Sequence, residues 1–220
     1  MEAPSEMKPD HRLLFGPLAA AILGFGIVGL ALCVLGYSHV RQTVSEIGEM
    51  GSPARIPFTI MLCAVALCLL VFAAGVAAES KRAGHGRLSA YLIAFMALSA
   101  AGVGIFAFPH PLHNIFGESE LIGYQAPLAF VLTWRADPKA RQLVAFSWIM
   151  FALIWISIAL NLTSLDRHSA LWTEMKPVYG LIQRSLFAAW FGWCALLGVL
   201  LWRRRVPQKP VSSIPREPRG

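Results

Sequence analysis

The sequence predicts an all-α fold: a polytopic bundle of six transmembrane helices with both termini in the cytoplasm. Three observations lead to this fold class. Of the 220 residues, 56% are hydrophobic and 14% are charged, which is too little polar surface for a soluble domain of this size. The apolar residues form long runs, and the lysines and arginines gather in alternate connections between these runs.

Each apolar run is long enough to cross a bilayer. A hydrocarbon core of about 30 Å takes roughly 20 helical residues at about 1.5 Å per residue. Buried helices of soluble proteins are shorter, and a transmembrane barrel would show alternating strands of about 10 residues. The predicted helices are Leu13–Leu35, Ile56–Ala78, Leu88–Phe108, His113–Trp134, Leu143–Leu162 and Gly180–Trp202.

The distribution of positive charge predicts the orientation of this bundle. Loops rich in lysine and arginine stay in the cytoplasm. The N-tail, the second loop, the fourth loop and the C-tail contain Lys8, Arg12, Lys81, Arg82, Arg87, Arg135, Lys139, Arg141, Arg203, Arg204, Arg205, Lys209, Arg216 and Arg219. The alternate loops contain Arg41, Arg55, Arg167 and Lys176. We therefore expect a multi-pass protein of the cell (plasma or inner) membrane with both termini inside.

The chain divides into a cytoplasmic N-tail (1–12), a six-helix membrane domain (13–204) and a disordered, basic cytoplasmic C-tail (205–220). The partner expected first is the lipid bilayer, with anionic headgroups at the cytoplasmic face attracting the basic tail. This asymmetry accounts for the net charge of +7 without nucleic-acid binding. Small-xxx-small pairs such as Ala188/Gly192 suit bundle packing, and also a membrane protein partner or a homo-oligomer.

The first outward loop, from Tyr37 to Pro53, is unusually polar for this chain. Its Thr43-Val44-Ser45-Glu46 stretch fits a capping box and predicts a short helical turn. Ser52 and Pro53 predict the start of the second helix, with serine at the N-cap and proline in the first helical position.

Arg184 lies about two turns, or roughly 10 Å, inside the last predicted helix. A charge at that depth costs at least about 2–3 kcal/mol unless it snorkels to the surface or is paired. Two interpretations follow. Its guanidinium extends to the outer headgroups, or it faces a polar pocket and pairs with Glu46, Glu49 or Glu120.

A polar stripe follows one face of the fourth predicted helix. His113, Gly117, Glu120 and Tyr124 recur at helical spacing, and such a stripe faces the bundle interior or water. We therefore expect an outward-facing polar pocket. Its candidate ligand-binding residues are Glu46, Glu49, His113, Glu120, Tyr124 and Arg184.

Zinc is a further candidate ligand on the outward side, because histidine and carboxylate side chains suit it. The candidate ligands are His39, His110, His113 and His168. They show no tight metal-binding spacing such as HExxH. The sequence shows no haem, nucleotide or flavin signature.

Three short motifs resemble a prokaryotic integral membrane family catalogued as domain of unknown function 998 (DUF998). They are "TVSEIGEMGSP", "FPHPLHNIFG" and "YGLIQR". Ser45, Glu46, Gly48 and Pro53 match the first family motif, Phe108, Pro109 and His113 the second, and Gly180, Leu181, Gln183 and Arg184 the third. Ile47 stands where the family usually has leucine. The resemblance covers residues 13–204 approximately, implies six helices with extracytoplasmic motifs, and implies no activity.

Three functions fit these observations. The first is a binding protein whose outward pocket takes a lipid headgroup or a small anionic solute, with Arg184 holding an anionic group. The second is a metal-dependent hydrolase of the outer leaflet, with His113 and another histidine holding the ion and Glu46 as the general base. The third is a structural scaffold, in which an arginine–glutamate pair fixes the helix register.

Overall fold

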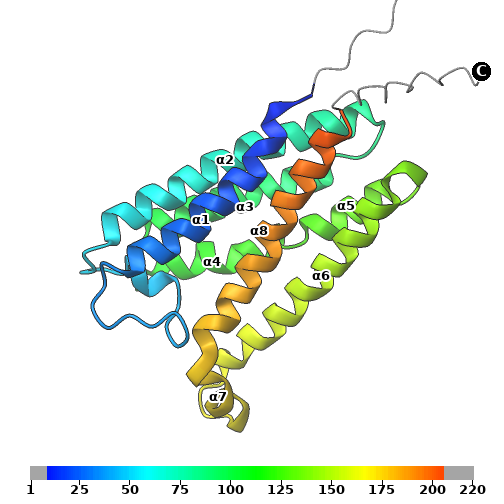
Figure 1. The fold of residues 1–220 in the computed structure, drawn as a ribbon. Coiled ribbons are helices and arrows are strands. Elements are labelled where there is room, and N and C mark those ends of the chain that lie inside the picture. Colours follow the sequence, from blue (N-terminus) through cyan, green and yellow to red (C-terminus); the bar gives the residue numbers. More distant parts are fainter. Residues whose placement is uncertain (1–8, 206–220) are drawn as a thin grey trace, which may run out of the picture.

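The computed structural model describes residues 9–205 and is all-α over that range, as predicted (Figure 1). Its α-helices are α1 Phe15–Ala31, α2 Arg55–Arg82, α3 Leu88–Ile105, α4 Pro111–Gly123, α5 Ala126–Trp134, α6 Arg141–Asn161, α7 Ala170–Met175 and α8 Tyr179–Arg203. The short 3-10 helices are η1 His11–Leu14, η2 Ser45–Gly48, η3 Pro138–Ala140, η4 Leu162–Leu165 and η5 Lys176–Val178.

Five helical segments are long and apolar enough to cross a membrane. They are His11–Ala31, Arg55–Arg82, Leu88–Ile105, Pro138–Leu165 and Ala170–Arg203. These segments correspond to five of the six predicted helices, of which Leu13–Leu35 and Leu88–Phe108 were predicted a few residues too long at their C-terminal ends. Residues 206–220 of the predicted C-tail (205–220) and residues 1–8 of the predicted N-tail (1–12) lie outside the described residues.

The prediction of one continuous helix over His113–Trp134 was wrong, because the structure breaks this segment between α4 and α5. Pro127, near the start of α5, has no N–H to donate to the carbonyl four residues earlier, that of Gly123. The indole of Trp190 in α8 donates to this carbonyl instead, at 3.3 Å. The break is thus a proline break whose freed carbonyl finds a partner on a neighbouring helix.

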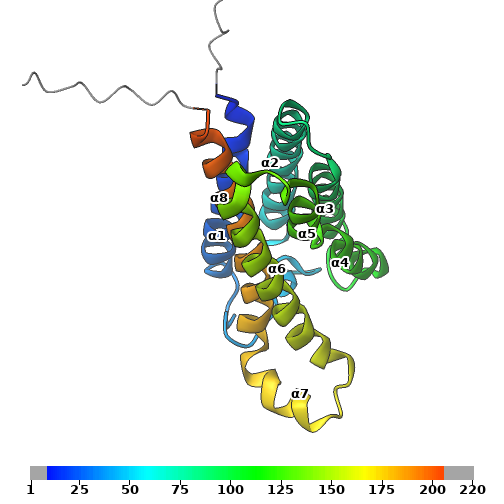
Figure 2. The same ribbon diagram turned by 90° about the vertical axis from the view of Figure 1, so that its right-hand side faces the viewer.

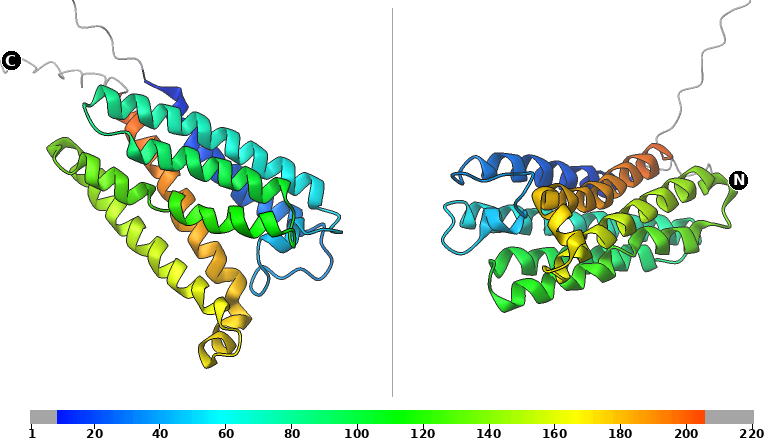
Figure 3. Two further views of the ribbon diagram at one scale, coloured as in Figure 1. Left: turned by 180° about the vertical axis from the view of Figure 1, so that it is seen from behind. Right: turned by 90° about the horizontal axis from the view of Figure 1, so that it is seen from below.

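The two halves still follow one path along α3 (Figures 2 and 3). Ser99 of α3 lies 2.8 Å from Ser119 of α4, hydroxyl to hydroxyl. Nearer the start of α3, the Ser89 hydroxyl donates to the carbonyl of Ala126 in α5 at 3.0 Å. Together α4 and α5 therefore run antiparallel to α3 over its length, although neither half reaches spanning length alone.

Close backbone packing joins α1 to α8 through two glycines. A Cβ on Gly198 would lie 2.3 Å from the Leu13 carbonyl oxygen, and one on Gly16 would lie 2.6 Å from that of Cys194. Phe72 lies against both glycines, and it is among the largest fully buried side chains of the bundle, with Trp134, Trp190, Trp193 and Phe130. Gly16 and Gly198 therefore allow the first and last long helices to pack without a side chain between their backbones.

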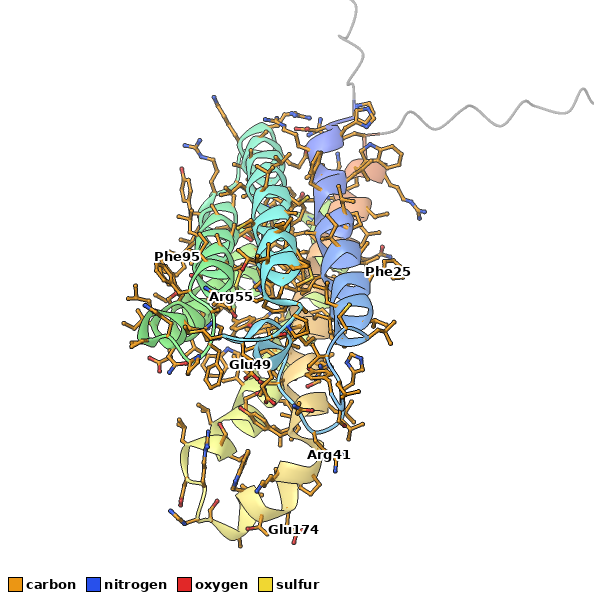
Figure 4. The ribbon with its side chains drawn as sticks, turned by 90° about the vertical axis from the view of Figure 1, so that its left-hand side faces the viewer. Phe25, Arg41, Glu49, Arg55, Phe95 and Glu174 are labelled. Atoms are coloured by element: carbon orange, nitrogen blue, oxygen red, sulfur yellow. The ribbon has the colours of Figure 1, made fainter. Side chains whose placement is uncertain are left out.

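Both ends of the described chain lie at the same end of the bundle, here called the terminal end (Figure 1). There Glu79 of α2 pairs with Arg205 at 2.7 Å and with Arg82 at 3.4 Å. His85, before α3, lies 3.6 Å from Asp137, before α6. The opposite end, here called the η2 end, carries η2 and α7, and Figure 4 shows Arg41, Glu49 and Glu174 there.

Candidate functional site

The connection between α1 and α2, residues 32–54, contains η2 and is called the η2 loop here. Its polar side chains bind its own backbone. The Tyr37 hydroxyl donates to the Thr43 carbonyl at 2.7 Å, and the Gln42 side chain accepts from Ser38 N–H at 2.8 Å. The Glu46 carboxylate accepts from the N–H and the hydroxyl of Thr43, at 3.0 and 2.9 Å, and from the Gln42 amide. The short turn expected from the capping-box motif is confirmed as η2, and Glu46 stabilises the loop.

The second helix begins two residues after Pro53, the first helical position expected from the Ser52-Pro53 signal, and one residue before the predicted apolar run at Ile56. The α2 helix starts at Arg55, with Ala54 at its N-cap. The Ser52 hydroxyl instead bridges the loop, donating to the Ile47 carbonyl at 2.6 Å and accepting from Ala54 N–H at 3.1 Å. Ser52 therefore closes the turn after η2 rather than capping α2 directly.

The predicted pairing of Arg184 with a carboxylate was wrong. Its Nη1 donates to the carbonyl oxygens of Gln42 and Gly180, both at 2.8 Å, and its Nη2 donates to the Tyr37 hydroxyl. The guanidinium also lies 5.7 Å from the centre of the Tyr37 ring. No ion pair joins Arg184 to an acidic side chain of residues 9–205. Carbonyl oxygens and a tyrosine hydroxyl bind both terminal nitrogens of the guanidinium because α8 begins directly against the η2 loop, while the buried Nε has no hydrogen-bond partner within residues 9–205.

Gly180 allows that close approach. A Cβ at this position would lie 2.5 Å from the Gln42 carbonyl oxygen and 2.6 Å from that of His39. We expect Gly180→Ala to push the loop away from α8 and to lower the free energy of unfolding by about 1–3 kcal/mol. Thermal unfolding in detergent measures this change.

Gly192→Ala is the matched control on the same helix, because its Cβ would meet one flexible atom of Met150 at 3.8 Å. It should leave the melting temperature nearly unchanged. Equal melting temperatures for the Gly180 and Gly192 variants would contradict the proposed role of Gly180.

His113 is buried and joins three segments. Its Nδ1 lies 2.8 Å from the Phe106 carbonyl oxygen and 3.1 Å from that of Val103. Carbonyl oxygens accept hydrogen bonds, so Nδ1 carries the proton. The Nε2 atom lies 3.0 Å from the Ser45 hydroxyl. In the neutral tautomer with the proton on Nδ1, the lone pair of Nε2 faces the hydroxyl of Ser45.

Gln183 of α8 binds Val44, the residue that directly precedes η2. Its side-chain oxygen accepts from Val44 N–H at 2.6 Å. Gln183, His113 and Arg184 therefore all bind the η2 loop, from α8 and from the start of α4. The three sequence motifs, which are far apart in the chain, meet at this loop.

A cavity of about 380 Å³ lies beside this junction, between α4, the α6–η4 segment and α8. It brings together three of the predicted site residues, His113, Glu120 and Tyr124. The Tyr124 hydroxyl donates to the Glu120 carboxylate at 3.1 Å. Sequence reasoning missed further polar residues of the lining. They are Ser45, Asn114, Glu118, Asn161, Ser164, Tyr179 and Gln183.

The other predicted site residues lie elsewhere. Glu46 is bound within the η2 loop, and Glu49 follows η2 (Figure 4). Arg184 lines a separate groove of about 320 Å³ between α1 and α8, together with His39. The helical period placed the α4 residues correctly, whereas the positions of Glu46 and Glu49 depend on how the loop folds.

The candidate zinc ligands do not come together. No three His, Cys, Asp or Glu side chains within residues 9–205 are grouped so that they could hold a metal ion. His110 caps α4 by accepting from Leu112 N–H at 3.1 Å, and His39 packs edge-on against Tyr37. Burial, and after it the charge of Arg184, lowers the pKa of His39.

The long apolar helices, their exposed apolar surfaces and the polar residues gathered at one end define a multi-span integral membrane protein. Residues 17–200 match the model of a family described as "Protein of unknown function (DUF998)". The chain belongs to this family, as the sequence motifs indicated. No curated protein and no solved structure matches it.

Proposed function

We propose that the chain crosses the membrane six times, with α4 and α5 as one broken crossing and both termini in the cytoplasm. The side-by-side position of α3 and the α4–α5 pair supports the sixth crossing. Arginines at the terminal end, such as Arg12, Arg82 and Arg204, support its cytoplasmic placement. In this orientation the membrane domain spans 13–204, the η2 end faces outward, and the tails 1–12 and 205–220 are cytoplasmic.

In that orientation we propose that the cavity between α4, α6 and α8 binds the headgroup of an outer-leaflet lipid. The observation that carries this proposal is a polar cavity with an apolar rim. Leu121, Leu162 and Leu165 line it while remaining 42%, 49% and 80% exposed. Asn114, Asn161 and the other polar lining residues supply hydrogen-bonding groups. An amphiphile fits this combination, and the volume suits a small polar group.

The charge of the lining favours a headgroup with an ammonium group. Glu118 and Glu120 both line the cavity, and its lining residues include no lysine or arginine. A small anionic solute would meet two carboxylates there without a positive partner. The expectation of an anion rested on Arg184, whose guanidinium is bound to the η2 loop. A zwitterionic lipid such as a phosphatidylethanolamine is therefore the ligand that this cavity fits best.

Gly117→Phe tests the proposal by filling the cavity. Gly117 lines it, and a Cβ there meets no atom within 4 Å, so a larger side chain can begin at this position and occupy the cavity. We expect native mass spectrometry of the purified variant to show at least tenfold less retained phosphatidylethanolamine than the wild type. The matched control is Gly29→Phe, because Gly29 of α1 also has open space around it and lies outside this cavity.

Equal lipid retention in wild type and Gly117→Phe, with both folded, would refute the headgroup site. Retention by neither protein would favour the structural scaffold, in which the contacts of Arg184 and His113 serve only to position the helices.

A further inference from the structure

We propose that Ser45 is a nucleophile, with His113 as its general base, and that it cleaves a carboxylic ester bond of the lipid held in this cavity. The inference rests on the proposed lipid site and adds a reaction to it. It keeps the hydrolase hypothesis but replaces the metal with a serine and a histidine.

The geometry of the pair is that of an activated hydroxyl. Ser45 Oγ lies 3.0 Å from His113 Nε2 and donates to it in the neutral tautomer, within the range for direct proton transfer between a nucleophile and its base. The other ring nitrogen donates to the Phe106 carbonyl at 2.8 Å. That bond fixes the tautomer and orientation of the ring, as the third member of a serine triad does. Ser45 and His113 both line the cavity, so the pair is open to its ligand.

Gln183 supplies a hydrogen-bond donor beside this pair. Its side-chain oxygen is occupied by the N–H of Val44, the residue that precedes Ser45 in the chain. The amide NH2 is therefore the group that Gln183 offers to the cavity it lines. A donor next to the nucleophile can stabilise the oxyanion that forms during attack on an ester.

The reaction proceeds in two balanced steps. Ser45 Oγ attacks the ester carbonyl carbon, its proton passes to His113 Nε2, and the carbonyl π electrons form an oxyanion that Gln183 stabilises. The oxyanion collapses, the bond to the alcohol oxygen breaks, and that oxygen takes the proton from His113. Water then attacks the acyl-Ser45 ester and gives a proton to His113. Collapse releases the fatty acid, and the proton returns to Ser45 Oγ.

A small alkyl fluorophosphonate tests the nucleophile directly. In this reaction the Oγ–P bond forms, fluoride leaves, and His113 takes the proton. We expect the full-length protein in detergent to form a covalent adduct on the peptide that contains Ser45, as read by mass spectrometry. Ser45→Ala should abolish this adduct, and His113→Gln should slow its formation by about 100-fold or more. Glutamine keeps an acceptor for Ser45 but cannot act as the base.

Ser185→Ala is the matched control, because Ser185 is also hydrogen-bonded, to Ser157 at 3.0 Å, and has no histidine partner. It should label like the wild type. If Ser45→Ala fails to fold, peptide mapping of the labelled wild type still decides the question. A wild type without an adduct at Ser45, or a His113→Gln variant that labels at the wild-type rate, overturns the proposal.

The two proposals fail in different experiments. Wild-type protein that retains phosphatidylethanolamine but does not label has a lipid site and no nucleophile, which overturns the reaction alone. Labelling at Ser45 with equal lipid retention in wild type and Gly117→Phe overturns the headgroup site, and the reaction on that lipid with it. Labelling, lipid retention and release of the fatty acid from a phosphatidylethanolamine with a fluorescent acyl chain together support both.

Discussion

Replacing Arg184 by alanine is expected to detach the η2 loop from α8 and to lower the free energy of unfolding by about 2–5 kcal/mol. The guanidinium donates to two carbonyl oxygens and to the Tyr37 hydroxyl. Removing it leaves Gln42 O without this partner. Arg184→Lys should recover part of the loss, because one ammonium group cannot reproduce the fork of the guanidinium.

Two measurements check this expectation. Thermal unfolding in detergent should show a lower melting temperature, and limited trypsin digestion should cleave faster after Arg41, an exposed residue of the η2 loop (Figure 4). Arg167→Ala is the matched control, because Arg167 is an exposed arginine after η4. An Arg184→Ala protein with the wild-type melting temperature and digestion rate would show that the loop does not depend on this side chain.

Trp190→Phe should cost about 2–4 kcal/mol, because it removes packing volume and leaves the Gly123 carbonyl without its donor. The same substitution should cost less in a Pro127→Ala background. There residue 127 regains an N–H that can bond to the Gly123 carbonyl within a continuous helix. The expected coupling between the two positions is about 1–3 kcal/mol.

This double-mutant cycle compares the wild type, the two single variants and the double variant. The control substitution is made in the wild-type and Pro127→Ala backgrounds. Trp193→Phe removes another buried indole, which donates to the Ser147 hydroxyl at 2.9 Å and has no contact with the freed carbonyl. Its cost should be the same in both backgrounds. If Trp190→Phe and Trp193→Phe behave alike, the indole of Trp190 is not what compensates for the proline break.

Hydrophobic periodicity and run length were enough to predict most of the bundle. Three of the six predicted helices lie within the spanning segments found, two more overlap them and extend a few residues beyond their ends, and α3 begins at the predicted Leu88. The break between α4 and α5 was not predicted. Pro127 indicates that a backbone bond is lost, but whether a helix bends or ends there depends on partners such as Trp190, which is distant in the sequence.

The candidate site was also predicted only in part, because some of its contacts join residues that are distant in the sequence. His113, Glu120 and Tyr124 share a helical face, so spacing alone brought them to one cavity. The depth of Arg184 correctly indicated that its charge needs partners, but those partners are set by the fold of the η2 loop. Ser45 and Gln183 belonged to the recognised motifs, yet their contacts with His113 and Val44 span 68 and 139 residues of sequence.

The division between α4 and α5 also affects how many membrane crossings are assigned to such a chain from a genome sequence. A search for uninterrupted apolar helices finds five here, and an odd number would assign the two ends of the polypeptide to opposite compartments. The ion pair between Glu79 and Arg205 and the contact of Arg82 with Asp10 instead hold both ends of the described residues, 9–205, at one end of the bundle. Reporter tags fused to either end should consequently give the same compartment signal.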